Sequence, residues 1–146
     1  MTEDNKMTLT FLSRSVNEGF ARGAVAAFVA QLDPTLEELA DIKTAVSEAV
    51  TNSIVHGYGH PTGLITIDCY INNAKTVTIS IHDDGRGISD VHQAIQPLFT
   101  ESNDTERSGM GFTVMETFMD SMTVESKPDC GTTVTLTKQI GNNLNL

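Results

Sequence analysis

The chain has 146 residues, of which 39% are hydrophobic and four are proline. This length supports one hydrophobic core and is too short for two ordinary domains, so we expect a single domain over residues 1–146. The 19 acidic and 9 basic residues give a net charge of −10. Such a balance argues against direct nucleic-acid binding, because few basic groups are available to neutralise phosphates. A bound polyphosphate would for the same reason need a metal ion.

The two cysteines, Cys69 and Cys130, have neither the spacing of a metal or redox site nor the density of a secreted disulfide scaffold. We expect both to be reduced thiols in or near the core. No apolar run follows the polar residues 1–6, and no stretch approaches the roughly 20 apolar residues of a membrane span. The sequence therefore predicts a cytoplasmic protein.

Residues 8–13 alternate between polar and apolar side chains and predict a first strand. Ser15 and Glu18 have the spacing of a capping box, so a helix should follow. Its expected buried stripe consists of Val16, Phe20, Ala24, Ala27 and Phe28. Arg22 should then lie on the opposite, exposed face.

A second helix should begin at Asp33-Pro34-Thr35, where we expect the proline in the first turn and acidic residues near the positive end of the helix dipole. Apolar residues recur at helical spacing from Leu36 to Ile54. Gly57 and Gly59 should end this helix.

Residues 64–71 and 76–82 alternate with period two on either side of a polar turn and predict a hairpin. The polar segment 89–107 has no clear period apart from a short helix over 91–96, and long loops of this kind are commonly functional. A third helix is expected over 109–120, and two further strands over 121–127 and 131–138. Together the elements predict a two-layer α/β sandwich, with helices on one face of a mixed, mostly antiparallel sheet.

Glu48 and Asn52 lie four residues apart on the second helix, so both side chains should share a face opposite Val46 and Val50. Asparagine is a poor helix former, and its position in mid-helix suggests a functional reason. An amide oxygen suits Mg²⁺, and a carboxylate one turn away is placed to accept a proton. The alternative is a solvated polar face, which for Glu48 alone is the simpler interpretation.

Asp83 continues the alternation of Ile79 and Ile81, so its carboxylate should point toward the buried side of the strand. A buried carboxylate needs hydrogen-bond donors, such as the exocyclic amine of adenine. The alternative is that Asp83 caps the following turn, in which Gly85 and Gly87 supply unusual backbone angles.

Thr132 has the same parity as Val134 and Leu136, which places its hydroxyl inward and close to Asp83 if the two strands are neighbours. An inward threonine that bonds only to backbone is the alternative interpretation.

Gly109 and Gly111 open the expected third helix, where backbone N–H groups are available to an anion. Arg107, just before it, is suited to a terminal phosphate. The alternative is an ordinary helix start capped by Ser108, with Arg107 in solvent. The sequence contains neither a dinucleotide-binding fingerprint nor a Walker loop.

The motifs together resemble the Bergerat-fold ATPases, a superfamily that includes histidine kinases and gyrase-type topoisomerases. Its N box and three glycine boxes look like Glu48-x-x-x-Asn52, Asp83-x-Gly85-x-Gly87, Gly109-x-Gly111-Phe112 and Gly131-Thr132. From about Leu9 to Thr137 the chain is also similar to bacterial anti-sigma factors that are serine kinases, and most closely to the family of sporulation anti-sigma F factors. Segments 24–35 and 106–112 are specific to that family.

The resemblance implies a site for ATP or ADP with Mg²⁺. Asn52 would coordinate the metal, Asp83 and Thr132 would recognise adenine, and residues 98–107 would form a lid that brings Arg107 to the γ-phosphate. The residues implied to contact nucleotide are Asn52, Asp83, Gly85, Gly87, Thr100, Arg107, Ser108, Gly109, Met110, Gly111 and Thr132.

The resemblance also implies partners. Glu48 would deprotonate a serine hydroxyl on a small anti-anti-sigma protein, which accepts the γ-phosphoryl group. A homodimer would hold a sigma factor of the sporulation sigma F type away from RNA polymerase, with Arg22 as a partner contact. The alternative is a nucleotide-gated sigma-binding module with little or no kinase activity. It is equally consistent with one departure, because relatives often carry Thr-Thr-Lys in the lid, where this chain has Thr100-Glu101-Ser102.

Overall fold

The computed structural model describes residues 4–59, 62–88, 90–95 and 111–141. Within this part of the chain the strands are β1 (Asn5–Leu12), β2 (Leu64–Ile71), β3 (Thr76–Asp83), β4 (Ser121–Ser126) and β5 (Thr132–Gln139). The α-helices are α1 (Asn17–Val29), α2 (Leu36–Asn52), α3 (Val91–Ile95) and α4 (Gly111–Phe118). A 3₁₀ turn, η1 (Ala30–Leu32), follows α1, and a π-helical segment, η2 (Ser53–Tyr58), continues α2.

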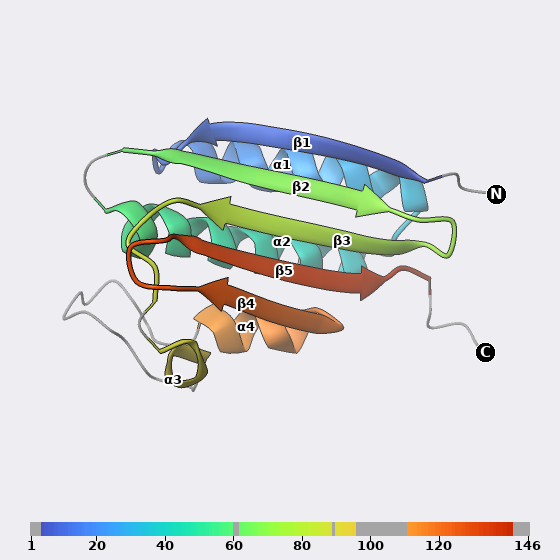
Figure 1. Cartoon of the computed structure of the whole chain (residues 1–146). Coiled ribbons are helices and arrows are strands. Elements are labelled where there is room, and N and C mark those ends of the chain that lie inside the picture. The colour runs from blue at the N-terminus through green and yellow to red at the C-terminus, as the bar shows by residue number, and fades with distance from the viewer. Residues whose placement is uncertain (1–3, 60–61, 89, 96–110, 142–146) are drawn as a thin grey trace.

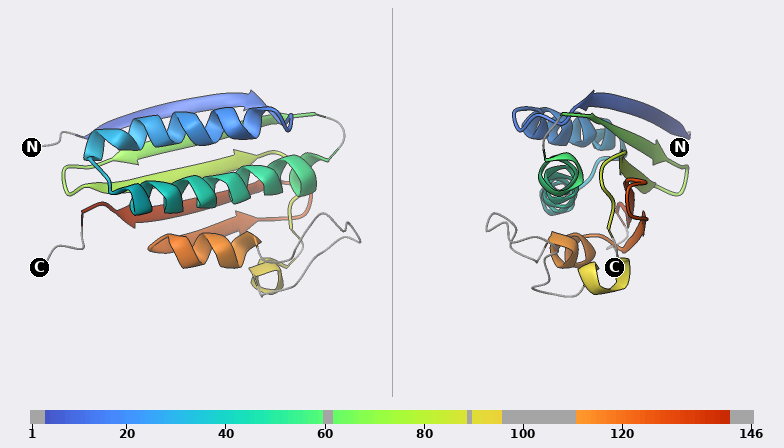
Figure 2. Two further views of the ribbon diagram at one scale, coloured as in Figure 1. Left: turned by 180° about the vertical axis from the view of Figure 1, so that it is seen from behind. Right: turned by 60° about the vertical axis from the view of Figure 1, so that its left-hand side comes forward.

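The strands form one sheet in the order β1-β2-β3-β5-β4, and each neighbouring pair is antiparallel. Helices α1, α2 and α4 lie on one face of this sheet (Figures 1 and 2). The predicted two-layer α/β sandwich is confirmed, and the described sheet is entirely antiparallel.

The central hairpin forms because β2 and β3 alternate apolar and polar residues over their whole length. In β3 every second residue is buried, from Val77 to Asp83. The turn is closed by Asn72, whose Oδ1 accepts hydrogen bonds from the backbone N–H groups of Ala74 and Thr76 at 2.9 and 3.0 Å. The register of this hairpin therefore sends Asp83 to the helical side of the sheet together with the isoleucines.

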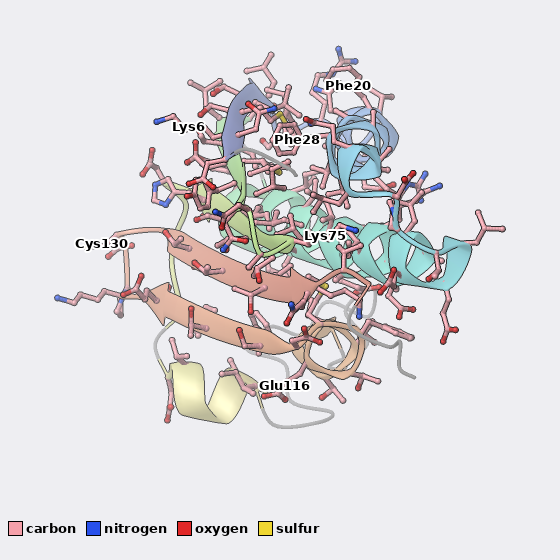
Figure 3. The ribbon with its side chains drawn as sticks, turned by 90° about the vertical axis from the view of Figure 1, so that its right-hand side faces the viewer. Lys6, Phe20, Phe28, Lys75, Glu116 and Cys130 are labelled. Atoms are coloured by element: carbon pink, nitrogen blue, oxygen red, sulfur yellow. The ribbon has the colours of Figure 1, made fainter. Side chains whose placement is uncertain are left out.

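The buried face of α1 differs from the predicted stripe. Val16 and Phe20 are 71% and 59% exposed. The fully packed residues of the helix are Ala21, Val25, Ala26 and Val29. Figure 3 shows Phe20 on the outer side of α1 and Phe28 on the side toward β1. Phe28 of the predicted stripe does pack, partly buried, against the core. The rest of the prediction was wrong because the packed face lies one residue further along the helix than the predicted stripe.

The helix starts also correct the sequence analysis. The N-terminus of α1 has no side-chain cap, so the capping box expected from Ser15 and Glu18 is not formed. At α2, Thr35 is the N-cap: its hydroxyl accepts the Glu38 N–H at 3.0 Å, and the Glu38 carboxylate accepts the Thr35 N–H at 2.8 Å. Pro34 therefore precedes the cap and does not lie in the first turn.

The end of α2 is longer than predicted. The chain continues through Gly57 in the π-helical segment η2 and leaves the helix at Gly59, which has φ +58°. Gly57 is therefore not a stop signal, whereas the helix does end at Gly59. Wider π-helical turns are frequent at functional sites, and this one packs against the end of β3.

The two cysteines lie in different environments. Cys69 is buried in β2, as expected, and burial raises the pKa of its thiol to about 12. Cys130 is exposed in the turn between β4 and β5 (Figure 3), so its predicted place near the core is wrong. In the described part of the chain, no helix combines the length and the hydropathy needed to cross a bilayer.

The capping box of α2 gives a test of the fold. We expect Thr35→Ala to lower the free energy of unfolding by about 1 kcal/mol, because it leaves the Glu38 N–H without its acceptor. Ser15→Ala is the matched control and should change stability by less than about 0.5 kcal/mol, since Ser15 caps nothing. Urea denaturation of the two variants measures both values. Equal losses would contradict the assignment of the cap.

Candidate functional site: a pocket at one end of the sheet

A pocket lies where η2, the end of β3, the start of β5 and helix α4 meet. In Figure 1, η2, the end of β3 and the start of β5 lie at the left-hand end of the sheet, and α4 lies toward its middle. The pocket has a volume of about 410 Å³ including its open mouth. Its lining residues are Ala49, Asn52, Ser53, His56, Gly57, Asp83, Arg86, Gly87, Ile88, Phe112, Thr132 and Val134. Apolar side chains and polar or charged side chains both line the pocket, and such a mixture suits a small molecule that carries polar groups.

Asp83 forms the floor of the pocket and is only 2% exposed. Its carboxylate accepts hydrogen bonds from the Ser53 hydroxyl at 2.8 Å and from the Gly85 N–H at 2.9 Å. Burial raises the pKa of Asp83, and the two hydrogen bonds oppose that rise. The predicted inward orientation is confirmed, and the bond from Gly85 shows that the same carboxylate also caps the following turn.

Thr132 lies directly opposite Asp83 in the β3–β5 register. Its side chain lines the pocket, so the predicted proximity to Asp83 is confirmed. The partner of its hydroxyl is another side chain, Ser126, with the two oxygens 2.8 Å apart.

Glycines allow the backbone to close around Asp83. A Cβ atom at Gly57 would lie 2.9 Å from the Asp83 carboxyl carbon, and one at Gly131 would lie 2.1 Å from the Asp83 carbonyl oxygen. At Gly85 a Cβ would lie 2.2 Å from the carbonyl oxygen of Gly57. Any of these side chains would displace the backbone or the carboxylate.

Gly87 has a different constraint. Its φ is +76°, and a Cβ would lie 1.9 Å from the carbonyl oxygen of Lys127. The packing of the protein's own backbone therefore explains why residues 85 and 87 are glycines. That these glycines also let the backbone approach a nucleotide is a proposal.

Glu48 and Asn52 occupy the face of α2 that meets the start of α4. A Cβ built on Gly111 would lie 3.3 Å from both Glu48 Oε1 and Asn52 Nδ2. The side chains of Val46 and Val50 are buried on the opposite face, as predicted. Asn52 and Gly111, which are 59 residues apart in the sequence, therefore lie close together in the fold.

Two properties distinguish this pair of polar residues from a solvated helix face. Asn52 Nδ2 is buried and has no hydrogen-bond partner within the residues that the structure describes. The pKa of Glu48 is raised, first by burial and then by the negative charge of Glu18. A buried amide without a partner among the described residues is consistent with a polar ligand at this place, and a carboxylate with a raised pKa is suited to proton transfer.

The side chains of this site suit a magnesium ion that takes most of its coordination from a bound phosphate and water. Among the described residues no group of three or more histidine, cysteine, aspartate or glutamate side chains is arranged to hold a metal. Mg²⁺ commonly takes one or two protein oxygens and completes its octahedral shell with phosphate oxygens and water. The side chain of Asn52 is consistent with this arrangement, since the orientation of an amide is assigned from its hydrogen bonds and Asn52 Nδ2 makes none to the described residues.

Arg22 lies outside the pocket, on α1. Its guanidinium is 3.7 Å from the Glu18 carboxylate, and its side chain is 41% exposed. Together with Lys43, Ser47 and Glu48 it lines a shallow groove along α1 and α2. Arg22 is therefore exposed only in part, and the groove connects it to Glu48.

Several predicted site residues cannot be placed. Thr100, Arg107, Ser108, Gly109 and Met110 lie outside the described residues, as does the expected lid over 98–107.

Ser53, Gly57 and Arg86 are among the lining residues that sequence reasoning did not predict. Ser53, the first residue of η2, lies seven residues after Val46 and so continues the apolar stripe of α2; a polar residue at this position was a usable signal. Gly57 and Arg86 gave no such signal. The Arg86 Nε–H donates to the His56 carbonyl at 2.7 Å, and its backbone N–H donates to the Gly57 carbonyl at 2.9 Å. Arg86 thus fixes η2 against the turn after β3.

Known proteins are similar to this chain over almost its whole length. Residues 12–138 match a family described as the histidine kinase-like ATPase domain. Over 142 residues the chain is 60% identical to the anti-sigma F factor of Thermoanaerobacter sp. strain X514, covering 97% of this chain and 99% of that protein. It is also 60% identical over 143 residues to the anti-sigma F factor of Caldanaerobacter subterraneus subsp. tengcongensis, covering 98% and 99%.

A solved structure has a similar fold. The crystal structure of the RsbU and RsbW domains of Rv1364c from Mycobacterium tuberculosis superposes with a TM-score of 0.67 and 19% sequence identity. The match covers 93% of this chain and 32% of that one. At this identity the similarity concerns the fold alone.

The glycine packing at Asp83 generates the second prediction. Gly57→Ala should lower the free energy of unfolding by about 1–3 kcal/mol, because its methyl group would overlap the Asp83 carboxylate. Gly23→Ala is the control, since a Cβ at this exposed position of α1 has no neighbour within 4 Å. That variant should gain about 0.5–1 kcal/mol from helix propensity. Urea denaturation measures the free energy of unfolding of both variants. A Gly57→Ala protein as stable as Gly23→Ala would refute the close contact between residue 57 and the Asp83 carboxylate.

Proposed function

The chain belongs to the histidine kinase-like ATPases, and within them to the anti-sigma F factors, and on this basis we propose that it sequesters a sigma factor and uses Mg·ATP to phosphorylate a serine of its antagonist. The observation that carries the proposal is that Asp83 and Asn52 line one pocket, while Glu48 lies one turn before Asn52 and beside the start of α4. Asp83 is suited to a base at the floor of the pocket, Asn52 to a metal, and Glu48 to a proton at the edge of the site.

Base recognition is assigned to the floor of the pocket. The carboxylate of Asp83 is buried and receives only two donors from the described residues, Ser53 and Gly85. The exocyclic amine of adenine would supply a further donor and so offset part of the cost of burying the charge. Thr132, opposite Asp83, would contact the same edge of the base.

The phosphate end is assigned to the region between α2 and α4. Asn52 would coordinate Mg²⁺ through its side-chain oxygen, and the metal would neutralise phosphate charge that this acidic chain leaves unbalanced. Gly111 leaves room for phosphates beside Asn52, because any side chain there would meet the amide. Thr100, Arg107, Ser108, Gly109 and Met110 would complete the binding of the phosphates from the lid and the residues before α4.

Glu48 is assigned as the general base. It would take the proton of the acceptor serine while the serine oxygen bonds to the γ-phosphorus and the bond to the β-phosphate oxygen breaks, leaving ADP. Its raised pKa, caused first by burial and then by Glu18, strengthens it as a base while it is ionised. Its place one turn before Asn52 puts the base beside the phosphate end of the pocket.

The groove that joins Arg22 to Glu48 suits a protein substrate. A small anti-anti-sigma protein that presents a serine to Glu48 would cover this groove, and the exposed part of Arg22 would contact it or the sigma factor. We place the binding of both partners in the cytoplasm, where RNA polymerase acts. We also propose that a homodimer is the unit that holds one sporulation-type sigma factor.

The second candidate function is a nucleotide-gated sigma-binding module that transfers phosphate poorly. The observation in its favour is Thr100-Glu101-Ser102, where relatives often carry a lysine. A missing cation over the phosphates would weaken charge neutralisation in the transition state more than nucleotide binding itself.

Label transfer from γ-labelled Mg·ATP to a purified anti-anti-sigma protein separates the two functions. Wild-type protein should label one serine of the partner. Glu48→Gln should slow transfer by at least about 100-fold, the usual worth of a general base, with ATP affinity changed only a few-fold. Asp83→Asn should instead weaken ATP binding by about 10- to 100-fold, because it removes a charge-assisted hydrogen bond.

Glu37→Gln provides the matched control, since Glu37 is an exposed carboxylate on the same helix. It should leave both transfer and ATP affinity unchanged. Tight ATP binding without label on the partner would favour the nucleotide-gated module. Unaltered ATP affinity in Asp83→Asn would overturn the assignment of the pocket floor.

A further inference from the structure

Ser126, the last residue of β4, makes three hydrogen bonds through one hydroxyl group. Its oxygen accepts the Ile88 N–H at 2.8 Å, and its proton is directed at the Gly131 carbonyl oxygen, also at 2.8 Å. The third neighbour is the Thr132 hydroxyl, again at 2.8 Å. Ser126 lies outside the pocket lining, and the pocket contains only its neighbours Ile88 and Thr132.

The direction of the bond between the two hydroxyls follows from counting protons. A serine hydroxyl has one proton and two lone pairs. The Gly131 carbonyl is only an acceptor and takes the proton of Ser126, while the Ile88 N–H occupies one lone pair. The remaining lone pair of Ser126 can only accept, so Thr132 must be the donor in the bond between them.

This direction fixes the polarity of the pocket floor. With its proton given to Ser126, Thr132 presents only lone pairs to the pocket. The other hydroxyl of the described lining, Ser53, gives its proton to Asp83. An ionised carboxylate is also an acceptor, so the side chains of Asp83, Ser53 and Thr132 form a floor that accepts hydrogen bonds and donates none.

We propose that Ser126 is a positioning residue that sets base specificity by holding Thr132 as an acceptor. The inference rests on the proposed function of the pocket as a nucleotide site. A purine with a 6-amino group donates two N–H bonds to such a floor. A 6-oxo purine would place an oxygen against the lone pairs of Asp83 and Thr132, and buried polar groups without partners discriminate strongly.

The consequence of losing the Ser126 hydroxyl is specific. Thr132 would be free to rotate its proton into the pocket, where it would donate to a 6-oxo group and compete less well for a 6-amino group. A merely structural role of Ser126, through its bond to Ile88, would instead weaken the binding of every purine nucleotide by the same factor. The ratio of two affinities therefore separates the two roles.

The experiment compares dissociation constants of Mg·ATP and Mg·ITP, which carry 6-amino and 6-oxo purines, for the full chain and its variants. The preference of the wild type for ATP should fall about 3- to 10-fold in Ser126→Ala, the worth of one neutral hydrogen bond. The same change made in a Thr132→Val background should have no further effect on the ratio, because Ser126 acts through the Thr132 hydroxyl.

A second pair of variants covers the case in which Ser126→Ala does not fold. Ser126→Thr and Ser126→Val have the same shape and suit an edge strand, but only threonine keeps the hydroxyl. Ser126→Thr should retain the preference for ATP, and Ser126→Val should lose it. Ser121→Ala, at the other end of β4 and hydrogen-bonded to Thr137, is the matched control and should leave the ratio unchanged.

Three outcomes would count against the account in different ways. Equal ratios for Ser126→Thr and Ser126→Val would overturn the role of Ser126 while leaving the nucleotide site intact. Equal losses of affinity for both nucleotides in Ser126→Ala would do the same and assign Ser126 to structure alone. Wild-type protein that binds neither nucleotide would overturn the proposed function itself.

Discussion

The pocket depends on a carboxylate that is buried at the end of a central strand. Asp83 reaches this place because it continues the inward alternation of β3, and an unpartnered charge there would cost several kcal/mol. The chain supplies two donors, from Ser53 and Gly85, and places glycines at 57 and 131 so that backbone can close around it. The raised pKa of Asp83 shows that burial still outweighs these bonds. A ligand that brings a further N–H donor therefore stabilises a group that the fold has only partly compensated.

Helix α2 and its continuation η2 connect this floor to the other end of the pocket. The apolar face of α2 packs on the sheet, while its polar face carries Glu48 and Asn52 toward α4. The wider turn of η2 then brings Ser53 and Gly57 onto Asp83. One continuous helical segment thus positions groups suited to a base, a metal and a proton. Under the proposed function, this segment would serve as the nucleotide site of a chain that belongs to the histidine kinase-like ATPases and has no Walker loop.

The sequence predicted the features that depend on local periodicity. Strand parity placed Asp83 and Thr132 inward, and helical spacing put Glu48 and Asn52 on one face. Prediction from the sequence failed where tertiary packing determines which residues are buried. The packed face of α1 is formed by alanines and valines, and Phe20 is left in solvent. The π-helical turn around Gly57 and the proton directions at Ser126 were also beyond sequence reasoning. The turn around Gly57 is held by a segment far away in the chain, through the backbone bond from Arg86 to Gly57. The hydrogen bonds of Ser126 depend on the turn before β5 and on Ile88, which no periodicity in the sequence reveals.

The central claim is that the buried carboxylate of Asp83 binds the nucleotide base, and the pKa of this one group tests it most directly. Carbon-detected NMR titration of the Asp83 carboxyl should give a pKa above the ordinary aspartate value in the nucleotide-free protein. Binding of a non-hydrolysable ATP analogue should lower that pKa, because a donor from the base stabilises the ionised form. A pKa that is raised in the free protein but unchanged when the analogue is bound would contradict the claim and place the base elsewhere.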